Sequence, residues 1–155
     1  MRGKQAPKRN LLPDPKYNNI LVSKFINYIM KNGKKTVAEK IVYECFEEIE
    51  KNIKKSGVEI FEQAVKNVAP QIEVRSKRIG GGNYQVPVEV RSARRDALAF
   101  RWILTATKSK KGKKMASKLS DELIEAYNNR GEAIKKKEDV YKMAQANRAF
   151  AHFVR

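Results

Sequence analysis

The sequence has little of what builds metal centres, disulfides and catalytic sites, because its 155 residues include one cysteine, one histidine and one tryptophan. A single cysteine cannot form an internal disulfide, and one cysteine with one histidine cannot fill a tetrahedral zinc site. His152 has no acid or nucleophile close to it in the sequence, and Cys45 lies in an apolar stripe where cysteine usually acts as a small hydrophobe. We therefore expect no metal, no cofactor and no small-molecule substrate, and the chain gives little support to an enzyme.

Long hydrophobic runs are also absent. No stretch approaches the roughly 18 apolar residues that a membrane-spanning helix needs. The first nine residues carry charges with no apolar segment after them, so a secretory signal is not expected. These absences predict a cytoplasmic protein without a membrane partner. A length of 155 residues with 41% hydrophobic residues is enough for one core, which favours a single domain.

Acidic residues are few compared with basic ones. Lys and Arg number 34 and Asp and Glu number 17, which gives a net charge of +17. Residues 1–35 hold 9 basic residues and 1 acidic one, and residues 75–114 hold 12 and 2, so the excess is concentrated in two blocks. A solvated surface explains a mixed pattern of charges, but it does not explain the second of these blocks. A surplus of this size favours nucleic acid or an anionic membrane as the partner.

Residues 72–91 break an otherwise helical pattern. Two stretches of alternating polar and apolar residues flank a glycine-rich turn at residues 80–83, which is a β-hairpin signal. Pro87 cannot donate a hydrogen bond to a strand ladder, which suits a two-stranded ribbon in which both strands are edges. One arm of the hairpin carries three basic residues, Arg75, Lys77 and Arg78. We expect this hairpin to protrude and to reach a polyanion.

Apolar residues at helical spacing predict six helices around the hairpin. The first five begin near Ile20, Thr36, Ser56, Ser92 and Met115, and the last carries Val140 and Phe150. Thr36 with Glu39 and Ser56 with Glu59 match capping boxes, and Ser92 is a candidate cap. The predicted fold is mainly α, a six-helix bundle with one protruding two-stranded β-hairpin between helices three and four. We expect residues 1–16, which are basic and contain three prolines, to form an extended tail, and residues 17–155 to form one helical domain with the hairpin at about 72–91.

The fourth predicted helix combines a basic face with an apolar one. Arg94, Arg101 and Lys108 are seven residues apart, and each step departs from whole helical turns by only about 20°. Arg91 and Arg95 lie close to this stripe, and the loop after the helix continues the basic block with Lys110, Lys113 and Lys114. The acids available as partners are Glu89 and Asp96. Two acids cannot neutralise five bases on the helix, so phosphate binding is favoured over a solvated surface.

Two aromatic residues belong either to the core or to a nucleic-acid site. Trp102 follows Leu98 by four residues, which is more typical of core packing than of base stacking. Tyr84 starts the second hairpin strand, where it could stack on an unpaired base, a contact worth about 1–3 kcal/mol, or pack against Ile79. The sequence leaves both alternatives for Tyr84 open.

Several long motifs follow one another along the chain. They are residues 10–19, Gly33-Lys34-Lys35 with Ile41-Val42 and Cys45, residues 80–90, residues 97–102, residues 129–131 and residues 143–153. In this order they resemble the bacterial small-subunit ribosomal protein seven family, from about Pro7 to Phe153. Ordered motifs of this length are far more specific than any single basic tract.

The resemblance implies a helical bundle with a protruding β-ribbon that binds the 3′ major domain of 16S ribosomal RNA and helps to nucleate the head of the 30S subunit. It places the hairpin tip near the exit-site tRNA and the mRNA path, and neighbouring proteins of the head and platform beside the chain. The tip residues are Arg78, Gly81, Gly82, Asn83 and Tyr84. The RNA contacts that it implies are Lys4, Lys8, Arg9, Lys34, Lys35, Arg75, Lys77, Arg78, Arg91, Arg94, Arg95 and Arg101, to which the basic block adds Lys108, Lys110, Lys113 and Lys114.

Two other classes of protein stay open on the residues alone. Architectural DNA-binding proteins also combine a helical body with proline-bearing β-arms, but their arm tips normally carry an apolar wedge, which the glycine-rich turn lacks. Competition between duplex DNA and structured RNA would separate these two classes. A protein-interaction scaffold is less favoured, since an acidic outer face is found only on the second predicted helix.

Overall fold

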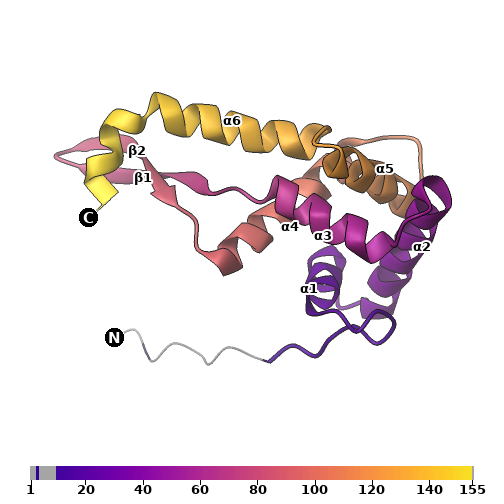
Figure 1. Cartoon of the computed structure of the whole chain (residues 1–155). Helices are drawn as coiled ribbons and strands as arrows, with labels where there is room; N and C mark the ends of the chain where they lie inside the picture. Colours follow the sequence, from indigo (N-terminus) through magenta and orange to yellow (C-terminus); the bar gives the residue numbers. More distant parts are fainter. Residues whose placement is uncertain (1–2, 4–9, 155) are drawn as a thin grey trace.

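The computed structural model describes Gly3 and residues 10–154 (Figure 1). Its elements, in order, are α1 (Ile20–Ile29), α2 (Lys35–Ile53), α3 (Gly57–Val68), β1 (Ile72–Ile79), β2 (Gly82–Glu89), α4 (Ser92–Ser109), α5 (Met115–Tyr127), α6 (Glu132–Ala146) and the 3-10 helix η1 (Arg148–Val154). The prediction of a mainly helical fold with one hairpin between the third and fourth helices is confirmed. Helical spacing did not separate η1 from the last helix. Within the described residues, no helix is long and apolar enough to cross a membrane.

The bundle is held together by a core to which all six α-helices contribute. Phe25, Phe46, Phe61 and Phe100 come from α1, α2, α3 and α4, and each is at most 1% exposed. The ring centroids of Phe25 and Phe61 lie 4.9 Å apart, and those of Phe25 and Phe100 lie 5.2 Å apart. Cys45 lies in the same core, and burial raises the pKa of its thiol. Its expected role as a small hydrophobe is confirmed.

Helix starts differ from the predicted caps. α1 begins after Asn19, whose side-chain oxygen accepts hydrogen bonds from two backbone N–H groups of the first turn, at 2.8 and 3.3 Å. α2 begins at Lys35, so Thr36 lies inside the helix and its predicted capping box with Glu39 is wrong. Ser92 is likewise the first residue of α4 rather than its cap, and that prediction is also wrong.

The start of α3 is set by packing rather than by a hydroxyl cap. α3 begins after Ser56 as predicted, but the Ser56 side chain makes no capping hydrogen bond. Glu50 Oε1 instead accepts from the backbone N–H of Gly57 at 3.1 Å. A Cβ atom on Gly57 would lie 2.7 Å from the Cβ of Phe46, so only glycine allows α3 to start this close to α2.

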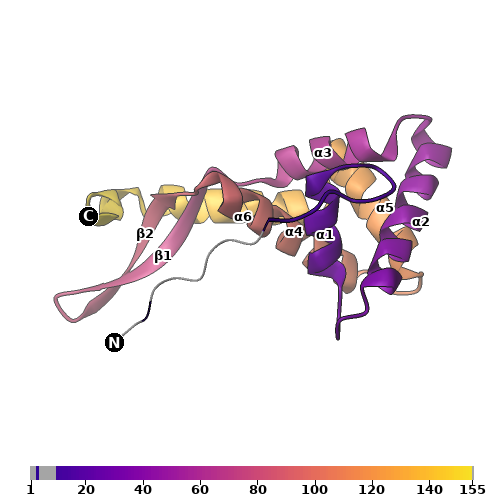
Figure 2. The ribbon, with the colours of Figure 1, turned by 90° about the horizontal axis from the view of Figure 1, so that it is seen from below.

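β1 and β2 form the predicted hairpin. The antiparallel register ends at the tip with Ile79 opposite Gly82. Gly80 and Gly81 have φ angles of +55° and +91°, which makes the two-residue turn favourable for glycine. The ribbon reaches away from the bundle, with α6 running beside it and η1 packed against β2 (Figures 1 and 2). The hairpin therefore protrudes as expected, but the C-terminal elements cover part of it.

Candidate nucleic-acid interface

The basic face of α4 is open to solvent along its length. Arg94, Arg101 and Lys108 are all exposed, whereas Phe100 and Ile103 of the same helix are at most 1% exposed. The seven-residue spacing keeps the three cations aligned. We call Arg94, Arg101 and Lys108 the α4 stripe. A polyanion can approach this stripe while the opposite side of the helix closes the core.

The N-terminal end of the α4 stripe is tied to the ribbon by Glu73 of β1. Arg94 Nε donates to Glu73 Oε2 at 2.7 Å, and Arg75 Nε donates to Glu73 Oε1 at 2.6 Å. The Glu73 side chain is 8% exposed. Burial by itself would raise its pKa, but the hydrogen bonds and charges of Arg94 and Arg75 outweigh burial and lower the pKa. One carboxylate here faces two guanidinium groups, so the junction keeps a positive charge.

Glu73 was not foreseen as the partner of Arg94, since the acids expected from the sequence are Glu89 and Asp96. A signal for it does exist in the sequence. Glu73 and Arg75 are two residues apart on a strand, so their side chains project from the same face. Their pairing with α4, however, depends on how the ribbon leaves the bundle, which no local pattern shows.

Arg91 and Arg95 are placed differently from the α4 stripe. Arg95 Nε donates to the backbone oxygen of Val90 at 3.0 Å, and its side chain borders a hollow together with Glu62 of α3. Arg91 is exposed at the residue before α4. The structure therefore aligns Arg94 with Arg101 and Lys108 but turns Arg95 toward the α3 side of the helix.

The loop after α4 divides its lysines between the surface and an internal ion pair. Lys110 Nζ lies 2.8 Å from Glu122 Oε2 and 2.9 Å from Glu125 Oε2. Burial lowers the pKa of Lys110, but these two carboxylates outweigh it and raise the pKa. Glu122 is fully buried, and its Oε1 accepts from the backbone N–H of Ala133 at 3.0 Å. Glu122 thus joins α5 to α6, and Lys110 ties the loop after α4 to α5. We do not include Lys110 in the proposed interface.

The remaining lysines of this loop lie at the surface. Lys108, Lys113 and Lys114 are exposed. Lys113 Nζ lies 2.7 Å from Asp121 Oδ2, in an ion pair that stays open to solvent. They extend the basic surface from the end of α4 to the start of α5.

The N-terminal basic block is described only in part. Lys34 and Lys35 are exposed at the start of α2, and Lys35 Nζ lies 3.8 Å from Glu39 Oε1. Lys4, Lys8 and Arg9, the other predicted contacts of this block, lie outside the described residues.

The ribbon tip is held by the C-terminal segment. Arg78, Gly81 and Asn83 are exposed at the tip, and Gly82 is half-buried. The ring centroid of Tyr84 lies 5.1 Å from that of Phe150 and 5.7 Å from that of Phe153. Lys77 Nζ donates to the backbone oxygen of Phe153 at 2.7 Å. We call these contacts of Phe150 and Phe153 with the ribbon the C-terminal clasp. It gives Tyr84 a packing partner that neither sequence alternative named.

Trp102 is half-buried and packs against the core, so the core-packing alternative for this residue is confirmed. It also borders a hollow between α4 and α6, together with Lys135 and Asp139.

A comparison with known proteins decides between the classes that the sequence left open. A family model described as "Ribosomal protein S7p/S5e" matches residues 1–148. The chain belongs to this family. It is therefore a ribosomal protein rather than an enzyme, an architectural DNA-binding protein or a protein-interaction scaffold.

Individual relatives within the S7p/S5e family are similar over nearly their whole length. The chain is 55% identical over 152 residues to "Small ribosomal subunit protein uS7" of Desulfatibacillum aliphaticivorans, covering 98% of this chain and 97% of that protein. It is 58% identical over 148 residues to the protein of the same name from Rhodopseudomonas palustris strain TIE-1, covering 96% of this chain and 95% of that protein. The protein of that name from Thermotoga maritima is 55% identical over 153 residues, with 99% of each chain covered.

Proposed function

We propose that this chain is the member of the small ribosomal subunit that binds the 3′ major domain of 16S ribosomal RNA directly and helps to nucleate assembly of the head. Family membership supports the ribosomal role. The α4 stripe is the observation that carries direct RNA binding. It presents three exposed cations along one side of a helix whose other side is fixed in the core.

The proposed interface extends from the α4 stripe in two directions. Through Glu73 it reaches Arg75 and the ribbon, and through the loop after α4 it reaches Lys113 and Lys114. Cations on a rigid helix and on a ribbon tied to it can hold two RNA segments at a set separation. Because the deep major groove of helical RNA excludes side chains, folded RNA would be read mainly through its shape and phosphates.

Affinity for RNA should depend steeply on salt, since phosphate contacts release bound counterions. If about 6–10 phosphates are contacted, affinity is expected to fall roughly 10³–10⁵-fold between about 50 and 200 mM salt. Binding with little salt dependence would count against a phosphate-dominated interface.

Charge reversal on the α4 stripe tests the proposal. Arg101→Glu with Lys108→Glu should weaken binding to an isolated 3′-domain RNA fragment in a gel-shift assay. Arg94 is left unchanged because it also pairs with Glu73 inside the protein. The matched control is Lys40→Glu with Lys51→Glu, which changes the charge equally at exposed positions of α2. Equal affinity of the two double variants would remove α4 from the interface.

For the ribbon tip we propose a second role, beside the exit-site tRNA and the mRNA path. Its support is the family membership and the reach of the ribbon away from the bundle (Figure 2). Arg78→Glu, an exposed change at the tip, should weaken binding to the 3′-domain fragment less than the charge reversal on α4 does, and should alter retention of exit-site tRNA in assembled subunits. Wild-type tRNA dissociation kinetics would argue against this role.

A further inference from the structure

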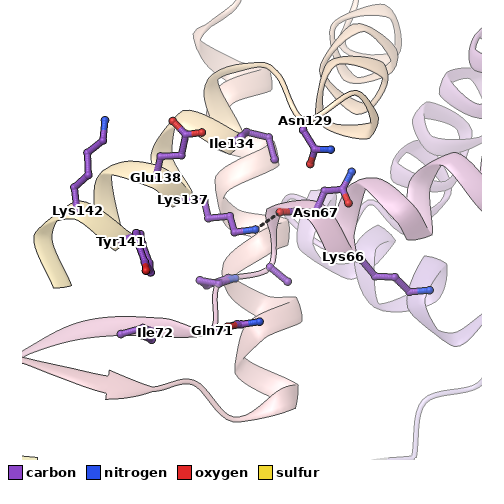
Figure 3. Close-up of a pocket in the computed structure, with 12 residues that line it drawn as sticks. Lys66, Asn67, Gln71, Ile72, Asn129, Ile134, Lys137, Glu138, Tyr141 and Lys142 are labelled. Carbon is purple, nitrogen blue, oxygen red and sulfur yellow. Dashed lines mark hydrogen bonds between the residues drawn. The ribbon is translucent and has the colours of Figure 1, made fainter. Parts of the chain in front are cut away.

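Two hollows meet along the side of α6 that faces the ribbon. The first, of about 540 Å³, lies between α6 and the segment that joins α3 to β1 (Figure 3). The second, of about 370 Å³, lies between α6, the ribbon and η1. Ile72 and Tyr141 border both hollows. We call the two hollows together the α6 groove.

Tyr141 is the aromatic residue at the centre of the α6 groove. The residue is 56% exposed, although Ile72 and Ala144 beside it give the groove apolar walls. Figure 3 shows Tyr141 projecting from α6 toward the ribbon, on the side of Ile72, and Lys137, one helical turn away, reaching toward Asn67. An aromatic ring that is exposed between two hollows is placed to stack on a flat group.

The charge of the α6 groove is positive. Four cationic residues border it, Lys66, Lys137, Lys142 and Arg148, against two acids, Glu138 and Glu89. Lys137 Nζ donates to the backbone oxygen of Asn67 at 2.6 Å, which fixes its position and uses one of its three N–H donors. Among the described residues, no further partner of Lys137 Nζ is found, so its other two donors can meet an anionic group. The amide side chains of Gln71 and Gln145 add hydrogen-bonding groups of both kinds.

We infer that the α6 groove binds a short unpaired segment of RNA, with a base stacked on Tyr141 and its phosphates near Lys137 and Arg148. A basic groove that contains an exposed aromatic ring is the usual arrangement for single-stranded nucleic acid. The volumes lie in the range of small-molecule sites, roughly 300–1,000 Å³, which suits one or two nucleotides better than a duplex or a folded protein partner. The inference rests on the proposed function and adds to it a site for unpaired RNA.

The residue proposed to stack on a base is thus Tyr141 rather than Tyr84. Tyr84 was the sequence candidate for stacking, but the C-terminal clasp places two phenylalanine rings against it. Tyr141 has no aromatic neighbour among the ring contacts of the described residues, and it is more exposed than Tyr84.

Binding of the full-length chain to a fluorescent 12-nucleotide oligouridylate at low salt tests the stacking. Tyr141→Ala should weaken binding about 5–150-fold, the range expected for loss of one stacked base, and Tyr141→Phe should bind like wild type. The matched control is Met143→Ala, since Met143 is 51% exposed on the same helix and borders neither hollow. An abasic oligomer of the same length should bind wild type and Tyr141→Ala equally. The inference is overturned if Tyr141→Ala and Met143→Ala bind the oligouridylate alike.

The 3′-domain fragment separates failure of this inference from failure of the proposed function. If wild type binds the folded fragment, and the α4 charge reversal weakens that binding, while Tyr141→Ala has no effect on oligouridylate, only the inference about the α6 groove is wrong. If wild type binds neither RNA, both are wrong.

Cross-linking inside the assembled small subunit tests the occupant. Gln145→Cys places a thiol at the edge of the α6 groove for attachment of a photo-cross-linker. The native Cys45 is fully buried, so the label should attach at one position. Cross-links to unpaired ribosomal RNA nucleotides would support the inference, and cross-links to protein alone would overturn the choice of RNA.

Discussion

The bundle and the arm, by which we mean β1, β2 and η1, are built on different kinds of contact. In the bundle, four phenylalanines that are each at most 1% exposed touch one another in the core. In the arm, the contacts that link it to α4 and to the C-terminal segment are partly exposed and join residues far apart in the sequence, such as Glu73 with Arg94 and Tyr84 with Phe150. We therefore expect the bundle to supply most of the stability, and these contacts to set the direction of the arm.

This difference matters for function because the cations of the two regions depend on different supports. Arg101 and Lys108 lie on a helix that is fixed by the core, so their positions should survive changes in the arm. Arg75 and Arg78 lie on a ribbon whose direction depends on Glu73 and on the C-terminal clasp. Changes that loosen the arm should alter its contacts with little loss of folding.

The largest effect is expected in the bundle core. Phe61→Ala removes a fully buried ring whose centroid lies 4.9 Å from Phe25 and 5.6 Å from Phe46. The free energy of unfolding should fall by about 3–5 kcal/mol, measured by urea denaturation. Phe150→Ala is the matched change in the arm. Because the Phe150 ring is partly exposed, its loss should lower the free energy of unfolding much less. Equal losses would contradict the division between bundle and arm.

The next effect lies at the edge of the bundle, where Lys110 pairs with the buried Glu122. Removing one partner of a buried ion pair typically lowers the free energy of unfolding by about 3–5 kcal/mol. Because the Lys110 side chain is 25% exposed, we expect Lys110→Ala to lower it by about 2–3 kcal/mol. Lys113→Ala, which breaks the exposed pair with Asp121, should cost no more than about 1 kcal/mol. Thermal unfolding of the two variants measures the contrast, and equal melting temperatures would disprove it.

A smaller and pH-dependent effect is expected at the base of the arm. Glu73→Gln weakens charged hydrogen bonds from Arg75 and Arg94, and should lower the free energy of unfolding by about 1–2 kcal/mol at pH 7. The pKa of Glu73 is lowered in the folded chain from an ordinary value of 4.5, so its stabilising effect is present above about pH 4.5 and is lost as pH falls through the lowered pKa.

The difference between wild type and Glu73→Gln should therefore shrink in acid, when unfolding is followed by circular dichroism from pH 7 down to about pH 3. Glu89→Gln changes an exposed carboxylate of the same ribbon and serves as the control. A difference that is constant with pH would show that the charge of Glu73 is not what stabilises the junction.

The smallest effect concerns the C-terminal clasp. A double-mutant cycle with Tyr84→Ala and Phe150→Ala should give a coupling energy of about 0.5–1.5 kcal/mol, the usual range for an aromatic pair. Hydrogen exchange should become faster at ribbon amides in Tyr84→Ala and stay unchanged in α2 and α3. Uniformly faster exchange in all elements would mean that the clasp belongs to the core and not to the arm alone.

The bundle was largely predictable from the sequence because its signals are local. The stripe of α2 with Val42, Cys45 and Ile49 repeats at helical spacing and is fully buried. The glycine turn at Gly80 and Gly81 predicts the hairpin because positive φ angles are needed there. Helix starts were less predictable, since α2 begins before Thr36 and α4 begins at Ser92 itself, and neither start has a side-chain cap.

The arm and its surroundings were less predictable because their contacts join distant parts of the chain. Lys110 reads as one more lysine in a basic tract until α5 brings Glu122 beside it. Tyr84 reads as an exposed ring until η1 brings Phe150 and Phe153 against it. Tyr141 lies in an ordinary helical segment, and only the approach of α6 to the ribbon places it between two hollows.

The salt dependence of RNA binding tests the role of the α4 stripe most directly. Arg101→Gln with Lys108→Gln removes two phosphate-binding charges, so the slope of log affinity for the 3′-domain fragment against log salt should become shallower by about 1.4–1.8. Lys40→Gln with Lys51→Gln, at exposed positions of α2, should leave the slope at its wild-type value. The same slope for wild type and both double variants would contradict the account.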